Sequence, residues 1–374
     1  MEGANMEGER LRAREAGLAV GYLPTGPDNA ITDVEGLRVG HRTAWRGNPG
    51  ADEPVIRSGV TAIIPHPGDL FRERLYAAVS AFNGYGEMTG NIVIDEWGLL
   101  GSPVMLTDTV SIGRVYDATS AYMVERDAEV YDVDVVIPVV AECDDGFLND
   151  NRAMPLTQED VFAALEGAVG GPVEEGSVGA GTGTQQFDFK GGIGTSSRAI
   201  EIQGTTFTVG VLLLTNYGNR HQLSIRGAPI GRTITDLMPE RHNEGSCIGV
   251  VATDAPLHPG QLKRLARRVA VGLGRTGSVG NDGSGEIFLA FSTANRIPRG
   301  YERAAYPIEV MIDGSFWTQG AAIDQFFEAV AEATEEAALN ALFKSETVTG
   351  RSGHVLHALP TERTLELLRD WHPI

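Results

Sequence analysis

The sequence predicts a layered α+β fold, in which β-sheets are covered by helices. Six short runs rich in β-branched residues are separated by Gly, Pro and Asp, as strands usually are. The runs come in clusters rather than in strict alternation with helical patterns, and this favours layered sheets over a doubly wound parallel sheet. The six predicted strands are 59–65, 133–140, 205–215, 247–253, 286–293 and 308–312.

Three segments have the apolar spacing of a helix. Thr157 and Asp160 form a start that resembles a capping box and predicts a helix over 161–169. Apolar residues at intervals of three and four predict a second helix over 260–273 and a longer one over 319–343. Since no period of 20–50 residues and no heptad pattern is present, the sequence does not predict a solenoid or a coiled coil.

The composition excludes several classes of protein. The 374 residues carry 50 acidic and 30 basic side chains, a net charge of −20, so the clustered cations of a nucleic-acid binder are missing. The apolar runs are far shorter than the roughly 20 residues that cross a bilayer, and the polar, acidic start does not resemble a signal peptide. Cys143 and Cys247 are the only cysteines and give no disulfide framework. We therefore expect a cytoplasmic protein without a nucleic-acid or membrane partner.

The sequence contains no motif for a nucleotide, a metal or an organic cofactor. In the glycine-rich segment 176–194, Lys190 precedes the final glycines, whereas a phosphate-binding loop places Lys after them. A dinucleotide fingerprint is followed by a helix, and here a polar and aromatic run follows from Gln185. The eight histidines show no zinc-type spacing. We expect 176–194 to be a structural loop and the active site to need no cofactor.

The junction of Gly245 and Ser246 is the strongest candidate for chemistry. The polar segment 226–245 ends there, and the apolar strand 247–253 follows directly. If this peptide bond is cut, Ser246 gains a free α-amine with a reference pKa of about 7.7–8.0, which can act as the base for the hydroxyl of the same residue. Gly245 has no Cβ, so its carbonyl can occupy a strained turn open to attack. Taken alone, a Gly-Ser pair before a strand is also typical of an ordinary turn.

Polar side chains also stand at the ends of three other predicted strands. Ser284 and Glu286 share one face of a strand, because side chains alternate between faces, and together they can orient a nucleophile and its proton. Asn216 ends a very apolar strand, where its amide can donate to an oxyanion. Glu142 ends another strand, where its carboxylate can receive a cationic amine. The alternatives are a solvated strand end and, for Glu142, a structural ion pair with an arginine. The face opposite Ser284 and Glu286 carries Ile287, Leu289 and Phe291.

Six segments spread over most of the chain match a single family pattern: 30–41, 139–150, 179–198, the segment around Asn216, 245–257 and 284–286. Together they resemble the self-cleaving serine aminopeptidases, which include L-aminopeptidase/D-amino-acid esterase-amidase and the β-peptidyl aminopeptidases. The resemblance implies a four-layer αββα sandwich like that of N-terminal-nucleophile hydrolases, with different connectivity and shared with ornithine acetyltransferase. It also implies one domain, 1–374, cut into an α chain, 1–245, and a β chain, 246–374. The two chains are expected to stay together, usually in a homotetramer of αβ units.

The same resemblance implies a role for each candidate residue. Ser246 matches the nucleophile, and Ser284 and Glu286 match its supporting pair. Asn216 matches the asparagine that stabilises the oxyanion. Glu142 matches the carboxylate that holds the free amine of the substrate in the β-peptidyl members.

Three neighbouring residues receive no catalytic role. Asp144 stands where another member of the family has a catalytically implicated Tyr, so that role is not carried over. Cys143 and Cys247 flank Glu142 and Ser246, and by strand alternation both are expected to point away from the site as buried filler.

We therefore expect an aminopeptidase that acts on short peptides, amino-acid amides or esters through an acyl-enzyme on Ser246. Two alternatives stay open. An acyltransferase of the ornithine acetyltransferase type would pass the acyl group to an amine, although that family uses Thr at the position of Ser246. An uncut, inactive binding protein would retain the bond between Gly245 and Ser246. The choice among L-α, D-α and β residues depends on the shape of the substrate pocket.

Overall fold

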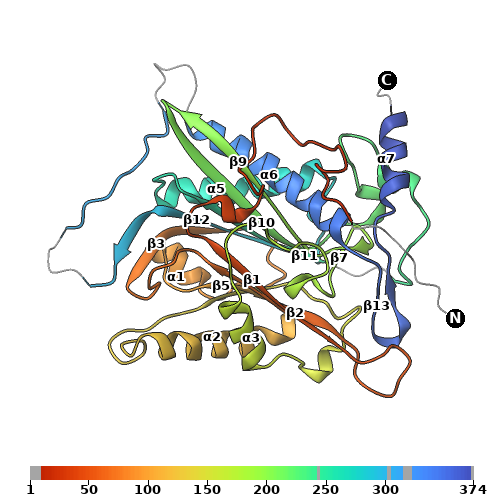
Figure 1. Cartoon of the computed structure of the whole chain (residues 1–374), viewed down its shortest axis with the longest axis horizontal. Helices are drawn as coiled ribbons and strands as arrows, with labels where there is room; N and C mark the ends of the chain where they lie inside the picture. The colour runs from red at the N-terminus through yellow and green to blue at the C-terminus, as the bar shows by residue number, and fades with distance from the viewer. Residues whose placement is uncertain (1–9, 242–244, 301–304, 315–321, 372–374) are drawn as a thin grey trace.

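The computed structural model describes residues 10–241, 245–300, 305–314 and 322–371, and Figure 1 shows them arranged as two facing sheets between two layers of helices. The first sheet has, in order, β1 (Arg38–Arg46), β2 (Ile56–Ile64), β5 (Val104–Thr107) and β6 (Val139–Glu142). The second sheet has, in order, β4 (Leu99–Leu100), β3 (Glu73–Ala81), β12 (Gly285–Pro298), β11 (Ser246–Thr253), β10 (Thr205–Asn216) and β9 (Ile193–Ile202).

Helices cover the outer face of each sheet. The first sheet is covered by α2 (Ile112–Arg126) and α3 (Gln158–Glu166), and the second by α5 (Pro259–Arg275) and α6 (Ala322–Lys344). The predicted four-layer αββα sandwich is therefore confirmed. The smaller elements are α1 (Asn91–Trp97), α4 (Ile230–Thr233), α7 (Thr361–Asp370) and the hairpins β7 (Gln185–Gln186) with β8 (Phe189–Lys190) and β13 (Val348–Thr349) with β14 (Val355–Leu356).

Local sequence signals explain the ends of the helices. At α3, the Thr157 hydroxyl accepts a hydrogen bond from the Asp160 N–H, and the Asp160 carboxylate accepts one from the Thr157 N–H. At α5, Pro259 occupies the first turn, and the ring of His258 accepts from the Gly260 N–H. These caps start the helices close to their predicted positions.

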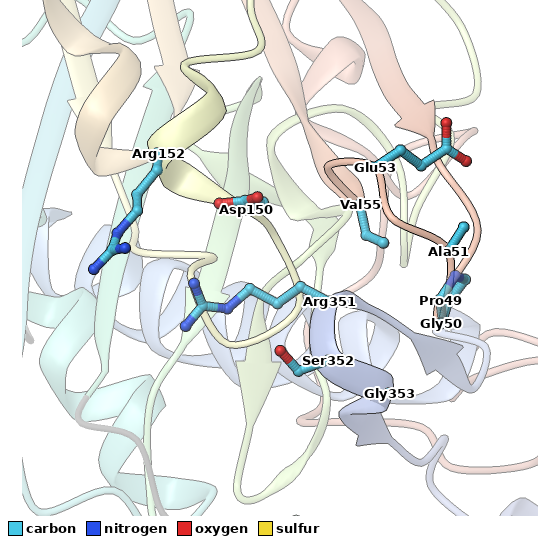
Figure 2. A pocket seen from close by; sticks show the side chains of 10 residues that line it. All are labelled: Pro49, Gly50, Ala51, Glu53, Val55, Asp150, Arg152, Arg351, Ser352 and Gly353. Atoms are coloured by element: carbon cyan, nitrogen blue, oxygen red, sulfur yellow. The ribbon is translucent and has the colours of Figure 1, made fainter.

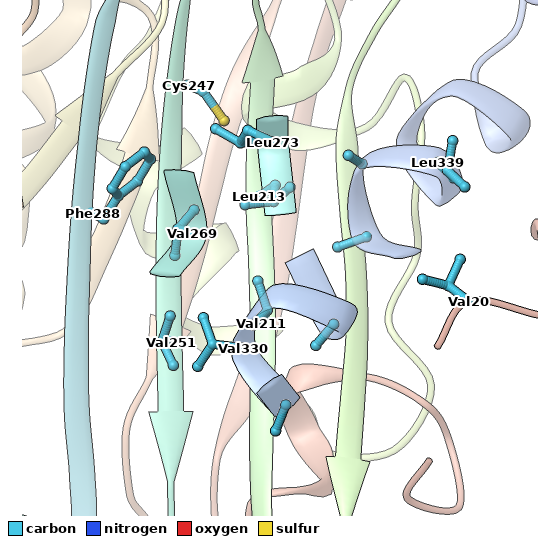
Figure 3. Packing of buried hydrophobic residues seen from close by; sticks show 14 of the residues in the cluster. Val20, Val211, Leu213, Cys247, Val251, Val269, Leu273, Phe288, Val330 and Leu339 are labelled. Carbon is cyan, nitrogen blue, oxygen red and sulfur yellow. The ribbon is translucent and has the colours of Figure 1, made fainter. Parts of the chain in front are cut away.

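Alternation along β11 places its side chains in two separate cores. Ile248 and Val250 face the core between the two sheets, whereas Cys247 and Val251 face the helices α5 and α6. Figure 3 shows this outer core, with Val269 of α5 packed over the sheet. Burying such side chains stabilises the fold by about 1.5–3 kcal/mol each.

The close approach of α6 to β9 depends on a glycine. A Cβ added at Gly194 would lie 1.9 Å from the carbonyl oxygen of Ala337, so no larger residue fits there. Charged residues reinforce the contact: Arg198 of β9 is fully buried, and its guanidinium lies 3.0 Å from Glu332 and 2.7 Å from Glu336 of α6. Buried charges of this kind require pairing, because an unpaired charge in the interior is very costly.

Two of the six predicted strands are wrong in whole or in part. Within 133–140, only Val139 and Val140 belong to a strand, because Val133, Val135 and Ile137 are exposed and lie outside the sheet. The segment 308–312 is not part of any sheet formed by the described residues. There, the side-chain amide of Asn295 exchanges hydrogen bonds with the main chain of Glu309 in place of a ladder.

The other four predicted strands correspond to β2, β10, β11 and β12, and the three predicted helices to α3, α5 and α6. Part of the longest predicted helix, 319–321, lies outside the described residues. The polar segment 226–245 contains the short helix α4, and its residues 242–244 also lie outside the described part of the chain. Across the residues that the structure describes, we find no helix with the length and apolar character needed to span a membrane.

Candidate active site

Ser246 is the first residue of β11 and lies between two strand ends. Its partner across the antiparallel ladder is Asn216, the last residue of β10, and its partner across the parallel ladder is Gly285, the first residue of β12. The Ser246 side chain is buried and, by alternation with Ile248, faces the space between the sheets. The register therefore brings a hydroxyl, a carboxamide and a backbone N–H to one place.

The carbonyl group before Ser246 is held by the neighbouring strand. The oxygen of Gly245 accepts a hydrogen bond from the Gly285 N–H, with an N···O distance of 3.3 Å. A Cβ added at Gly245 would lie 1.8 Å from the carbonyl oxygen of Asn216, so only glycine fits at this position. The hydrogen bond withdraws electron density from the carbonyl and favours attack at its carbon.

The carboxamide of Asn216 has a fixed orientation. Its Oδ1 accepts from the backbone N–H of Gln185 at 3.0 Å, and its Nδ2 donates to the carbonyl oxygen of Asp144 at 2.9 Å. Because a backbone N–H can only donate and a carbonyl can only accept, these partners define which end of the amide is nitrogen. A second N–H remains on Nδ2 for a further acceptor.

Ser284 and Glu286 form a pair, as their shared face predicts. The Ser284 hydroxyl donates to Glu286 Oε1 at 2.5 Å, while Glu286 Oε2 is buried without a hydrogen-bond partner among the described residues. Burial raises the pKa of Glu286, and the neighbouring Ser284 hydroxyl and Asn83 amide oppose that rise. The carboxylate is therefore able to accept another proton or hydrogen bond.

This pair lies on the face of the second sheet that Ser246 does not use. Glu286 is the ladder partner of Cys247 and alternates with Ile287, which faces the space between the sheets. Gly285, the ladder partner of Ser246, stands between Ser284 and Glu286 in the sequence. The pair is thus nearer to the main chain of Ser246 than to its hydroxyl.

Glu142 ends β6, as predicted, and is almost completely buried. Its Oε1 accepts from the Glu87 N–H at 3.0 Å, and its Oε2 accepts from the Thr109 hydroxyl. A Cβ added at Gly86 would lie 3.2 Å from Glu142 Oε1 and 3.4 Å from the Gly285 Cα, so Gly86 lets the carboxylate approach β12.

The surroundings of Glu142 are electronegative. Burial raises the pKa of the Glu142 carboxyl, and the charges of Asp144 and Asp108 raise it further. Among the described residues, no Lys, Arg or His forms a salt bridge with Glu142, so the structural ion pair considered above is not found there. The described residues therefore supply no salt bridge to balance the charge of the Glu142 carboxylate.

The two cysteines do not behave alike. Cys247 points into the outer helical core, as expected. Cys143 does not point away from the site: it belongs to the core between the sheets, where its thiol contacts the Ser246 side chain and lies 3.6 Å from the carbonyl oxygen of Leu214. Burial raises the pKa of the Cys143 thiol well above its usual value, so it stays protonated. The prediction that Cys143 points away from the site is wrong. It was based on alternation within one strand, whereas the contact with Ser246 arises from the packing of one sheet on the other.

Sequence reasoning did not identify Gly285 or Thr109 as parts of the site. Gly285 was recognisable only as the residue between Ser284 and Glu286, and Thr109 carries no local signal.

A cavity of about 600 Å³ lies elsewhere, between the loop 49–55 and residues 351–353, and is not lined by any of the candidate residues (Figure 2). The strand register, rather than this cavity, marks the candidate site.

Comparisons with known proteins agree with this arrangement. Residues 29–356 match the model of peptidase family S58. The chain is 38% identical to a β-peptidyl aminopeptidase from Sphingosinicella microcystinivorans over 97% of this chain and 93% of that protein, and 40% identical to one from Sphingosinicella xenopeptidilytica over 97% and 92%.

A solved structure gives the same result for the fold. The L-aminopeptidase D-Ala-esterase/amidase from Ochrobactrum anthropi, described as a prototype of the serine aminopeptidases and a variant of the Ntn hydrolase fold, superposes with a TM-score of 0.89. It is 42% identical over 96% of this chain and 98% of its own. The chain therefore belongs to peptidase family S58 and is a serine aminopeptidase of the N-terminal-nucleophile type.

Proposed function

We propose that the chain cuts itself between Gly245 and Ser246, and that the mature enzyme releases N-terminal residues from short peptides, amino-acid amides or esters. The observation that carries the proposal is the hydrogen bond from the Gly285 N–H to the Gly245 carbonyl, directly beside the Ser246 side chain. A polarised carbonyl next to a hydroxyl at the start of a buried strand is suited to internal attack.

Self-cleavage begins with attack of the Ser246 oxygen on the Gly245 carbonyl carbon. The hydroxyl proton passes to the Ser246 nitrogen as the C–N bond breaks, which leaves an ester and a free α-amine. Water then hydrolyses the ester, so that Gly245 ends in a carboxylate and the Ser246 oxygen regains a proton. The Gly285 N–H stabilises the oxyanion of the first step; such a donor contributes about 3–4 kcal/mol.

In turnover, the α-amine of Ser246 accepts the proton of its own hydroxyl as the oxygen attacks the substrate carbonyl. The second N–H of Asn216 Nδ2 and the Gly285 N–H donate to the oxyanion. The leaving amine takes the proton, and water hydrolyses the acyl-enzyme. We assign Ser284 and Glu286 to orienting the α-amine, because the pair lies beside the main chain of Ser246 and Glu286 Oε2 has a free acceptor position.

The role proposed for Glu142 is to bind the ammonium group of the substrate. The carboxylate is held by the Glu87 N–H and the Thr109 hydroxyl, and its described surroundings contain no salt-bridge partner. A charge-assisted hydrogen bond to the substrate amine would supply the missing positive charge. Two relatives are named β-peptidyl aminopeptidases, so substrates with an N-terminal β residue are proposed beside those with L-α residues.

After cleavage, the α and β chains are expected to stay associated. β11 of the β chain would lie between β10 of the α chain and β12, and β12 would remain paired with β3 of the α chain. Removing one peptide bond leaves these ladders intact. We propose a homo-oligomer of such αβ units, and a cytoplasmic location consistent with two buried free thiols.

The test compares the wild-type chain with Ser246→Ala. Intact mass spectrometry should give fragments of 245 and 129 residues for the wild type and a single 374-residue chain for the variant. A panel of L-α, D-α and β amino-acid anilides should be hydrolysed only by the wild type. Active wild-type enzyme with an intact chain would contradict self-cleavage, and transfer of the acyl group to an added amine in preference to water would favour the acyltransferase alternative.

A further inference from the structure

The glycine-rich loop 176–194 contains a lysine that the mechanism above does not use. Lys190 is fully buried, and its ammonium donates to the carbonyl oxygens of Gly181 at 2.8 Å and Gly191 at 2.7 Å. Burial lowers the pKa of Lys190 to about 7, partly offset by the charge of Asp145. Burying a charged lysine costs free energy. A role beyond filling space would explain why a lysine occupies this position.

The two carbonyl groups belong to opposite limbs of the loop. Gly181 lies on the limb that leads into β7, and Gly191 lies on the limb that leads into β9. The side chain of Lys190 therefore ties the limbs together. Main-chain contacts join the same limbs: the Gly191 N–H donates to the Thr184 oxygen at 3.1 Å. Next to this bond, β7 pairs with β8.

Both limbs hold the end of β10. The first limb supplies the Gln185 N–H that donates to Asn216 Oδ1. The second limb supplies Gly192, whose N–H donates to the Thr215 hydroxyl at 3.0 Å and whose carbonyl accepts from the Thr215 N–H at 3.0 Å. The last two residues of β10 are thus hydrogen-bonded to both of the limbs that Lys190 connects.

The orientation of the Asn216 amide depends on the hydrogen bond from the first limb. Without a fixed Gln185 N–H, only the hydrogen bond from Nδ2 to the Asp144 carbonyl holds the amide, which can then rotate more easily about its last side-chain bond. Rotation would turn an oxygen towards the reacting carbonyl, and an oxyanion hole works only when its donors are already aimed.

We propose that Lys190 is a positioning residue for the oxyanion donor Asn216, acting through the two limbs of the loop 176–194. The inference rests on the proposed function, in which Asn216 donates to the oxyanion. Lys190 itself touches neither the substrate nor Ser246.

A methionine at this position removes the ammonium while keeping most of the apolar side chain. Both carbonyls would retain a partner, since Gly191 also accepts from the Ser345 hydroxyl at 2.5 Å and Gly181 from the Thr184 hydroxyl at 3.2 Å. Lys190→Met is therefore expected to fold and mature. If it does not accumulate as folded protein, Lys190→Gln, which keeps a shorter donor, replaces it in the same measurements.

The experiment measures turnover of an amino-acid anilide and of its thioanilide, per matured chain. Lys190→Met should lower kcat on the anilide by about 10- to 100-fold with KM changed less than about threefold, the pattern of an interaction made in the transition state. On the thioanilide the loss should be under about threefold, because sulfur is a weak acceptor and gains little from an amide donor. A merely structural defect would lower both rates equally.

The matched control is Lys344→Met, which removes another lysine-to-carbonyl hydrogen bond, from Lys344 to Arg10 at 2.7 Å, outside the loop. It should keep kcat within about twofold on both substrates. Full anilide turnover by Lys190→Met, or an equal loss on both substrates, would overturn the inference. Failure of the proposed function is distinguishable, because it would show as absence of turnover by the wild-type chain itself.

Discussion

The Gly285 N–H donates to the carbonyl oxygen of Gly245 across the junction of β11 and β12, with an N···O distance of 3.3 Å. This one contact links the bond proposed for self-cleavage to a strand that carries Ser284 and Glu286. Because β12 pairs with β11 in parallel, the first residues of both strands lie side by side. The register of the sheet, set by its apolar residues, thereby determines the geometry of the site.

Gly245→Ala should stop maturation. The added Cβ would lie 1.8 Å from the Asn216 oxygen, so the Gly245 carbonyl has to leave its hydrogen bond to Gly285. We expect self-cleavage to slow by more than about 100-fold, the usual effect of losing one oxyanion donor. Intact mass spectrometry after timed incubation measures the fraction that remains uncut.

The control for this variant is Gly274→Ala. Gly274 lies in α5, and a Cβ there meets no atom within 4 Å. The change should leave maturation unaffected and stabilise the helix by about 0.5–1 kcal/mol. Wild-type cleavage in Gly245→Ala would show that the tight packing at Gly245 is irrelevant to the reaction.

Glu142→Gln should weaken the binding of substrates that carry a free amine. Loss of a charge-assisted hydrogen bond costs about 1.5–3 kcal/mol, which corresponds to a rise in KM of roughly 10- to 100-fold. Steady-state kinetics on one anilide, with and without an N-acetyl group, measures the effect. Acetylated substrates hydrolysed by the wild type as well as free ones would remove Glu142 from substrate recognition.

The same residue predicts a pH dependence. Only the ionised carboxylate attracts an ammonium, and burial together with Asp144 and Asp108 raises the pKa of Glu142. KM of the wild type should therefore rise as the pH falls through this raised pKa, at a higher pH than for an exposed Glu. In Glu142→Gln, KM should be independent of pH over that range, and a parallel rise in both proteins would assign the titration to another group.

The positions of the site residues at strand ends were predictable from the sequence, but the residues that they contact in space were not. Asn216 and Glu142 end β10 and β6, where polar residues follow buried apolar runs, and Ser246 begins β11 as expected. The contact of Cys143 with Ser246 depends on how two sheets stack, and the pairing of Ser246 with Gly285 depends on a register between distant segments.

Burial also explains the errors of the fold prediction. The segment 133–140 is β-branched but mostly exposed, so its composition resembles a strand although only its end joins the sheet. The helix α2 is missing from the prediction although Val115, Ala118 and Tyr122 have helical spacing, because small and polar residues weaken its apolar face. Tertiary contacts decide both cases.

Glu286→Gln should affect chemistry more than folding. The carboxylate accepts from Ser284, and its second oxygen has no hydrogen-bond partner among the described residues, so little native hydrogen bonding is lost. We expect slow or absent maturation, and in matured chains a kcat lowered by about 100-fold with a modest change in KM. Mass spectrometry, thermal melting and steady-state kinetics on the one variant separate the effects.

A neighbouring serine provides the control for this strand. Ser292 lies on the same face of β12, and its buried hydroxyl donates to the Ala255 oxygen at 2.6 Å, away from Ser246. Ser292→Ala should lower the melting temperature slightly and leave kcat unchanged, whereas Ser284→Ala should lower kcat. Normal cleavage and normal kcat in Glu286→Gln would exclude Glu286 from the site, and a lower melting temperature with separated chains would mean that it only anchors them.

Arg198→Met should weaken the association of the two mature chains. Arg198 belongs to the proposed α chain, and its partners Glu332 and Glu336 on α6 belong to the β chain. Breaking a buried ion pair by removing one partner costs about 3–5 kcal/mol, because the other charges stay buried. Matured enzyme should melt at a lower temperature and separate into its chains at lower denaturant, which size-exclusion chromatography with mass analysis detects. Lys263→Met, which removes the exposed pair with Asp95 between the same two chains, should cost under about 1 kcal/mol.

Acid should act on the same contact. Burial alone would raise the pKa of Glu336, but hydrogen bonding to Arg14 and the charge of Arg198 outweigh it and hold that pKa below its ordinary value. A carboxylate with a lowered pKa stabilises the folded state above its unfolded pKa, and this stabilisation is lost as the pH falls through the folded pKa. Chain separation should therefore begin only below the ordinary pKa of Glu, and Glu336→Gln should abolish this part of the pH dependence. If wild type and Glu336→Gln lose association over the same pH range, the buried ion-pair cluster does not control the pH dependence of chain association.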